Sequence, residues 1–256
     1  MKRISFAAVL GLALAAAGCG RSGRQELIVY AGAGLMPPVQ EALDRFSAEH
    51  HVLIKPIPSG SGLLLAQITT TRRGDVYIPG DEFYMKQAAD AGFVVSQKDV
   101  AFFVPVIAVA KGNPHGVRTL ADLTDPKLRV GLGEPEHCAV GRISKLILQK
   151  QGLFEKVKPK YTASGVPELG NAVAMGSVDA AIIWDAIARF HPNDVDVVPI
   201  PPQENVIVAI PVGVLSFSKN PELARALQDY LASPVGREIF ARNGYTVENP
   251  ESKGPR

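Results

Sequence analysis

The chain has 256 residues, with 27 basic side chains, 25 acidic side chains and a formal net charge of +2 at pH 7. Nucleic-acid binders carry a surplus of basic residues clustered on one face, so this near balance without blocks of like charge excludes that class of partner. Only two cysteines occur, which excludes a disulfide framework, and a chain of this length buries enough apolar surface to fold without one.

The N-terminal segment has the layout of a secretory signal over residues 1–18, with Lys2 and Arg3 followed by an apolar run. This run is too short to span a bilayer, and no later stretch approaches the roughly 20 apolar residues that a transmembrane helix needs. Removal of residues 1–18 takes away two basic residues and no acids, so the mature chain is predicted to carry 25 residues of each sign and a net charge near zero.

Cys19 follows directly after three small residues, an arrangement that resembles the lipobox of bacterial lipoproteins. The resemblance implies that the Cys19 thiol carries a diacylglyceryl group, and residues 19–26 then form a short polar tether. Acyl chains hold a protein at a membrane without a helix that crosses it. The alternative is ordinary cleavage near this point, which would leave a free thiol. In both cases we expect an exported protein.

From residue 27 onward, short runs rich in valine and isoleucine alternate with amphipathic stretches, which predicts an α/β fold. A first unit is predicted to have strands at residues 27–31, 52–57 and 75–78 and helices at 37–50, 63–71 and 81–91. A second unit is predicted to have strands at 129–132, 161–164, 180–184 and 195–200 and helices at 120–123, 142–151 and 166–175. Helices at 221–232 and 234–243 are expected to close the chain.

Two long apolar runs, at residues 102–110 and 206–217, are predicted to be strands that cross between two lobes. A chain that crosses twice has a discontinuous first lobe and an inserted second lobe. We expect lobe 1 to comprise residues 27–105 and 212–256, and lobe 2 to comprise residues 106–211. The sequence shows no internal repeat.

Small or glycine-rich residues stand immediately before four predicted helix starts, at residues 32–34, 59–62, 138–141 and 164–166. In an open α/β sheet such turns lie at the carboxyl ends of strands, where ligands bind. A helix N-terminus leaves backbone N–H groups unpaired and carries about half a positive charge. Several converging helix starts therefore predict an anion site that needs no lysine or arginine.

The chain resembles the molybdate-binding proteins of ABC importers from about residue 27 to residue 247. The order and spacing of seven segments carry the resemblance: residues 29–35, 59–68, 74–81, 111–114, 133–137, 180–185 and 239–245. The resemblance implies the type II periplasmic-binding-protein fold, with two lobes that close over a small oxyanion, most simply molybdate or tungstate. It also implies a permease and its ATPase as partners. One-to-one docking on a permease needs no oligomer, so we expect a monomer.

In that family the tetrahedral oxyanion is held by two serine hydroxyls, backbone N–H groups and a tyrosine hydroxyl. The resemblance implies that Ser61 is the second serine and that Val140 and Val166 are the backbone donors. Two positions depart from the pattern, because Gly34 stands in place of the first serine and Trp184 in place of the tyrosine. Gly34 keeps its backbone N–H and Trp184 offers an indole N–H, which donates but cannot accept. These departures leave the identity of the oxyanion open.

Other residues near these loops are possible additional ligand contacts, namely Ala33, Gly62, Glu136 and Asp185. The acidic residues Asp81, Glu82, Glu134, Glu136 and Asp185 would repel an anion that they faced, so they either cap helices or lie on the rim. A site dominated by Glu136, His137 and Asp185 would instead favour a cation. His137 and Cys138 are adjacent, but no further ligand completes a metal set, so we expect no metal site.

Enzymatic function is not expected, because the chain has neither the Gly-x-Ser-x-Gly spacing of a nucleophile elbow nor a phosphate-binding loop. No cofactor is implied. Arg72, Arg73 and Arg142 are either solvated helix residues or groups that grip a larger acid or phosphonate. Three readings stay open besides molybdate or tungstate. These are another oxyanion of the sulfate, phosphate or phosphonate type, a metal ion bound through carboxylates, and a lipoprotein that senses or presents rather than transports.

Overall fold

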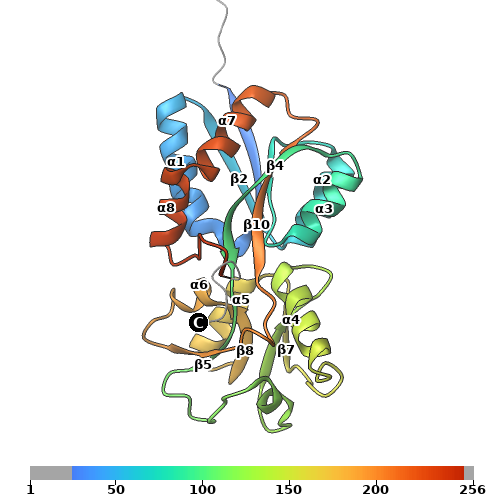
Figure 1. The fold of residues 1–256 in the computed structure, drawn as a ribbon, viewed down its shortest axis with the longest axis vertical. Helices are drawn as coiled ribbons and strands as arrows, with labels where there is room; N and C mark the ends of the chain where they lie inside the picture. The colour runs from blue at the N-terminus through green and yellow to red at the C-terminus, as the bar shows by residue number, and fades with distance from the viewer. Residues whose placement is uncertain (1–24, 251–256) are drawn as a thin grey trace, which may run out of the picture.

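The chain folds into two lobes, each built on a mixed β-sheet of five strands with helices around it, in a computed structural model that describes residues 25–250 (Figure 1). The predicted α/β fold class is thereby confirmed. The predicted signal segment, Cys19 and most of the tether lie outside the described residues. Within residues 25–250, no helix has the length and apolar character that crossing a membrane requires.

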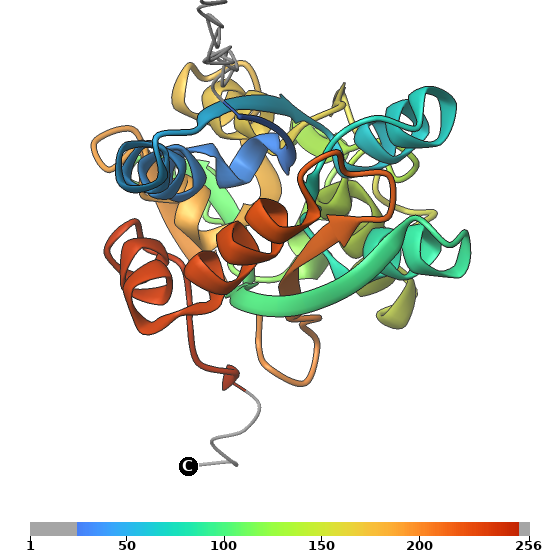
Figure 2. The same ribbon diagram turned by 90° about the horizontal axis from the view of Figure 1, so that it is seen from above.

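The first sheet is ordered β2-β1-β3-β10-β4. Its strands are β1 (Glu26–Gly32), β2 (Leu53–Ser59), β3 (Val76–Ile78), β4 (Val94–Phe103) and β10 (Val208–Leu215). The surrounding helices are η1 (Ala33–Leu35), α1 (Met36–His50), α2 (Ser61–Thr71), α3 (Glu82–Asp90), α7 (Pro221–Ala232) and α8 (Pro234–Arg242). Seen from above, α1 and α8 gather on one side of this lobe and α2 and α3 on the other (Figure 2).

The second sheet is ordered β7-β6-β8-β5-β9. Its strands are β5 (Pro105–Ala110), β6 (Val130–Gly133), β7 (Tyr161–Ala163), β8 (Ala180–Trp184) and β9 (Val195–Pro199), and its helices are η2 (Leu120–Thr124), α4 (Ala139–Lys150), α5 (Val166–Ala174) and α6 (Asp185–Ala188). In each sheet three strands are parallel, with β1 between β2 and β3 in the first and β6 between β7 and β8 in the second. Two further strands lie beside β3 and beside β8. The carboxyl ends of the parallel strands in both lobes therefore face the cleft between the lobes.

The chain crosses between the lobes at Val104 and again between Pro199 and Val208. The apolar run at 102–110 is thus two strands in different sheets, since Phe103 ends β4 and Pro105 already pairs with Trp184 of β8. The expected return to the first lobe at residue 212 falls inside β10, which pairs with β4 from Val208 onward. Both long apolar runs are buried because they form the strands that flank each crossing.

An aspartate at the start of the third parallel strand connects that strand to the first in both lobes. Asp75 precedes β3, and its Oδ2 accepts the backbone N–H of Ile28 in β1 at 2.7 Å while its Oδ1 accepts the Ser218 hydroxyl. Asp179 precedes β8, and its Oδ2 accepts the backbone N–H of Arg129 at 2.8 Å. Both carboxylates are buried, at 6 % exposure. The same contact therefore fixes the end of each sheet that is remote from the cleft.

We expect Asp75→Ala to lower the free energy of unfolding by about 1–3 kcal/mol, because the Ile28 N–H and the Ser218 hydroxyl lose a buried charged acceptor. Chemical denaturation followed by circular dichroism measures this difference. Asp90→Ala is the matched control, since Asp90 is exposed and forms only an i,i+4 pair with Lys86, worth at most about 0.5 kcal/mol. Equal stability of the two variants would contradict the role assigned to Asp75.

Candidate anion-binding site

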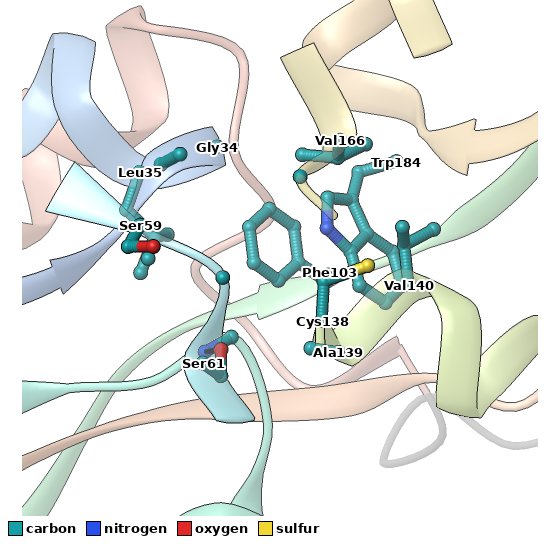
Figure 3. Close-up of a pocket in the computed structure, with 15 residues that line it drawn as sticks. Gly34, Leu35, Ser59, Ser61, Phe103, Cys138, Ala139, Val140, Val166 and Trp184 are labelled. Carbon is teal, nitrogen blue, oxygen red and sulfur yellow. Dashed lines mark hydrogen bonds between the residues drawn. The ribbon is translucent and has the colours of Figure 1, made fainter. Parts of the chain in front are cut away.

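A small cavity lies between the lobes at the carboxyl ends of the parallel strands (Figure 3). It is lined by Gly32, Ala33, Gly34, Leu35, Ser59, Gly60, Ser61, Gly80, Phe103, Cys138, Ala139, Val140, Gly165, Val166 and Trp184. The space open to the centre of a water-sized guest is about 20 Å³. A cavity of this size holds a guest of very few atoms. The closed lobes therefore select for small ligands.

The four helix starts that the sequence singles out meet at this cavity. The residues that precede η1, α2, α4 and α5 are Gly32, Gly60, Cys138 and Gly165, and none of their side chains caps the helix that follows. By contrast, Asp81 caps α3 and Ser233 caps α8 through side-chain oxygens. Uncapped helix starts leave backbone N–H groups available for a ligand, and a negatively charged ligand also interacts favourably with the helix dipoles.

Ser61 is the first residue of α2, and its side chain is held in a fixed orientation at the cavity wall. Its Oγ accepts the backbone N–H of Gly80 at 2.9 Å, and its carbonyl oxygen accepts the Tyr77 hydroxyl at 2.8 Å. Burial raises the pKa of Tyr77 well above its usual value, so this phenol stays a neutral donor. Because Gly80 already donates to Ser61 Oγ, the Ser61 hydroxyl is set to donate its own proton to a guest.

Trp184 and Phe103 form an aromatic wall that joins the two lobes. Trp184 ends β8 in the second lobe, Phe103 ends β4 in the first, and their rings stack at 4.4 Å with an interplanar angle of 11°. Within residues 25–250, the indole N–H of Trp184 donates to no protein acceptor. Figure 3 shows the indole nitrogen on the edge of the ring that is turned toward the first-lobe residues. Trp184 can therefore offer a donor at the position where the resemblance implies one.

The cavity wall is neutral. Within the described chain, no lysine, arginine, aspartate or glutamate lines it, and burial raises the pKa of the Cys138 thiol to about 11, which keeps that side chain protonated at neutral pH. Across residues 25–250, no group of three or more histidine, cysteine, aspartate or glutamate side chains is arranged to hold a metal ion. The arrangement presents N–H and O–H dipoles to a guest, and this chemistry suits an anion.

The residues named from the sequence divide into two groups. Gly34, Ser61, Val140, Val166, Trp184 and the possible contact Ala33 all line the cavity. The other three possible contacts, Gly62, Glu136 and Asp185, lie outside the lining. Gly62 donates its N–H across the cleft to the His137 carbonyl at 2.9 Å, and Glu136 is exposed beside a separate groove. Asp185 begins α6, where its own side chain accepts the Ala186 N–H, and burial raises its pKa.

Several cavity residues do not follow from the sequence patterns, notably Gly80 and Phe103. Gly80 follows the buried strand β3, and its backbone N–H orients Ser61 across 19 residues of sequence. Phe103 is the last residue of β4, and the sequence patterns do not predict a strand over residues 94–101. A glycine after a buried strand is a usable signal for close backbone approach. The aromatic stack depends on the pairing of distant strands and has no local signal.

Glycines on the first lobe allow the two lobes to approach closely. A Cβ placed on Gly34 would lie 2.4 Å from Val166 Cγ1, and one on Gly60 would lie 2.4 Å from the carbonyl oxygens of His137 and Ser164. A Cβ on Gly62 would lie 2.1 Å from the Glu136 carbonyl oxygen. All these neighbours belong to the second lobe. The structure is therefore a closed form whose cleft surfaces fit only because the first lobe lacks side chains there.

The chain belongs to the bacterial extracellular solute-binding protein family, whose model matches residues 27–246. It is 29% identical over 225 residues to a putative binding protein of Haemophilus influenzae, with 86% of this chain and 90% of that protein covered. It is 25% identical over 255 residues to the molybdate-binding protein ModA of Escherichia coli, with 96% and 99% covered. The structure of the sulfate-binding protein SubI of Mycobacterium tuberculosis shares the fold, with a TM-score of 0.78, 17% identity, and 89% and 88% covered.

These comparisons confirm the resemblance to molybdate-binding proteins of the type II periplasmic-binding-protein fold. The chain is the substrate-binding component of an ABC importer, and proteins of this class work with permease and ATPase subunits. Its family binds solutes without converting them, so the chain is not an enzyme. Such binding proteins act outside the cytoplasmic membrane.

Gly34→Ser introduces the serine that the resemblance implies at this position, yet we expect it to weaken ligand binding about 5- to 150-fold. The added Cβ meets Val166 Cγ1 in the closed form, and overpacking of this kind costs about 1–3 kcal/mol. The double variant Gly34→Ser with Val166→Ala removes the clash and should recover most of the affinity. Isothermal titration with molybdate measures both. Tighter binding by Gly34→Ser alone would contradict this prediction, because it would show that the closed lobes accommodate the side chain and that its hydroxyl binds the ligand.

Proposed function

We propose that the chain is a lipid-anchored, monomeric receptor that captures a small tetrahedral oxyanion of the molybdate or tungstate type and delivers it to an ABC permease. One observation carries the proposal: uncapped starts of α2, α4 and α5 and the Ser61 hydroxyl converge on a small neutral cavity between the lobes. The proposed donors are the backbone N–H groups of Gly34, Val140 and Val166, the Ser61 hydroxyl and the Trp184 indole.

The donor chemistry favours an oxyanion that carries no proton. Backbone and indole N–H groups only donate, and Ser61 Oγ already accepts from Gly80, so Ser59 Oγ is the one side-chain oxygen of the lining left as an acceptor. A protonated oxyanion, such as phosphate near neutral pH, would bring a hydroxyl that needs an acceptor, and a buried donor without one costs about 1–3 kcal/mol. Molybdate, tungstate and sulfate carry no proton at this pH. The cavity wall therefore supports these anions over phosphate and phosphonates.

The metal-ion alternative has little support, because the carboxylates it needs lie outside the cavity. Sulfate is the second candidate, since it has the same charge and shape as molybdate and is smaller. The relatives support molybdate, since the curated protein from Escherichia coli that matches nearly the full chain is a molybdate-binding protein. Gly34 and Trp184 alter both the donors and the shape of the site, and direct titration distinguishes molybdate from sulfate.

Ser61→Ala should weaken binding of the preferred oxyanion by about 1–3 kcal/mol, or about 5- to 150-fold, because a buried anion loses one donor. Trp184 is the only tryptophan and lines the cavity, so its fluorescence reports occupancy directly. Titration of molybdate, tungstate, sulfate, phosphate and divalent metals against the wild-type protein should give the largest affinity with molybdate or tungstate.

Ser216→Ala is the matched control for this titration, since the Ser216 hydroxyl donates to the Gly92 carbonyl on the first lobe and lies outside the cavity lining. Its affinity should equal that of the wild type. If Ser61→Ala also matches the wild type, Ser61 does not bind the ligand. If divalent metal ions change the Trp184 fluorescence and none of the oxyanions does, the oxyanion proposal is contradicted.

The membrane anchor is proposed from Cys19, which precedes the described residues, and from the short tether that follows it. Cys19→Ser removes the acylated thiol, so the protein should move from the membrane fraction to the soluble fraction of fractionated cells. Cys138→Ser is the matched control, because Cys138 is buried at the cleft and should leave the distribution unchanged. A wild-type protein that is found entirely in the soluble fraction would contradict anchoring.

A further inference from the structure

An ion pair between a buried carboxylate and a partly exposed guanidinium joins the two lobes beside the cavity. Asp81 lies at the start of α3 in the first lobe and is 0 % exposed, and Arg142 lies on α4 in the second lobe. Arg142 Nε donates to Asp81 Oδ2 at 2.9 Å. The two residues belong to different lobes, so closure of the lobes brings them together. The pair contributes no group to the cavity lining.

Each partner of the pair is fixed by further contacts. The other oxygen of Asp81 accepts the backbone N–H groups of Phe83 and Tyr84, which caps α3. The guanidinium carbon of Arg142 lies 4.5 Å from the centre of the Phe83 ring. Burial raises the pKa of Asp81, and the charge and hydrogen bond of Arg142 lower it in opposition. Burial thus disfavours the ionised form of Asp81, and Arg142 favours it in the closed form.

The pair is attached directly to the elements that form the site. Gly80 precedes Asp81 and donates the hydrogen bond that orients Ser61. Arg142 lies one helical turn after Ala139 on α4, whose uncapped start faces the cavity. A second contact across the cleft lies nearby, where the Tyr84 hydroxyl donates to the Pro135 carbonyl at 3.0 Å. Any movement of the lobes that separates Arg142 from Asp81 also separates the donors of α2 from those of α4.

We infer that Arg142 and Asp81 form an interlobe latch that stabilises the closed cleft over the bound anion, with Arg142 as a positioning residue that never touches the ligand. The inference rests on the proposed function, since closure matters here as the step that assembles the anion site. Arg142 then binds Asp81 and is not a group that grips a larger acid or phosphonate. In the open form both side chains regain water, and in the closed form each neutralises the other.

Removal of Arg142 leaves the Asp81 carboxylate buried and unpaired in the closed form only, and removal of Asp81 leaves the partly desolvated Arg142 guanidinium without its partner there. Both changes shift the equilibrium toward the open form. Arg142→Met and Asp81→Asn should each weaken molybdate binding about 10- to 1000-fold, mainly through faster dissociation. Asparagine keeps the cap of α3, so Asp81→Asn preserves the local fold. The double variant buries no unpaired charge, so its loss should be much smaller than the product of the two single losses.

Lys145→Met is the matched control, because it removes one positive charge from the same helix without touching the first lobe; the Lys145 ammonium faces Phe154 of its own lobe. It should bind molybdate as the wild type does, which separates the latch from long-range attraction of an anion. Titration and stopped-flow fluorescence of Trp184 measure affinity and dissociation. The inference is overturned if Arg142→Met binds molybdate as tightly as Lys145→Met does. It is also overturned if the affinity loss of the double variant equals the product of the two single losses.

A readout without ligand separates failure of the latch from failure of the proposed function. Small-angle X-ray scattering of the anion-free proteins should give a larger radius of gyration for Arg142→Met than for the wild type and Lys145→Met. If no oxyanion binds the wild type, the proposed function fails, while this difference still supports the latch. Equal radii of gyration for all three proteins would overturn the latch.

Discussion

The unpaired backbone N–H groups at helix starts are the constraint on which the site depends. Each such group needs an acceptor, and most helices take one from a side chain at the position before the helix. Gly32, Gly60 and Gly165 have no side chain to offer, and the Cys138 thiol makes no cap. Because parallel strands in both lobes point their carboxyl ends at the cleft, the unpaired donors gather at one place. A small anion satisfies them together.

The same absence of side chains lets the lobes close. Gly34, Gly60 and Gly62 lie within contact of second-lobe atoms, so one choice of residue serves both donor access and close approach. Closure brings Asp81 against Arg142, and Phe103 stacks on Trp184 beside the crossing at Val104. Binding and closure are therefore one process, in which a neutral cavity forms only when both lobes contribute. Loss of water from the cavity strengthens each N–H and O–H contact with a charged guest.

The sequence predicts the fold well where burial leaves a local pattern. The strand β8 is buried along its full length and reads as a continuous apolar run, whereas the edge strand β4 carries exposed residues such as Lys98 and Asp99 and is missed. The cavity residues Ser61, Val140 and Val166 follow from the order of the motifs. Glu136 and Asp185 share those loops but point elsewhere, and side-chain direction is set by packing that no motif encodes. The Asp81–Arg142 contact spans two lobes and has no sequence signal at all.

The most direct test of neutral dipoles as the ligand-binding groups is a crystal structure of the protein with tungstate, in which anomalous scattering locates the metal. We expect a closed cleft with the anion between the starts of α2, α4 and α5, and with its oxygens within hydrogen-bond distance of Ser61 Oγ and the backbone nitrogens of Val140 and Val166. An anomalous peak beside the carboxylates of Glu136 or Asp185, or only on the outer surface of the lobes, would contradict this expectation.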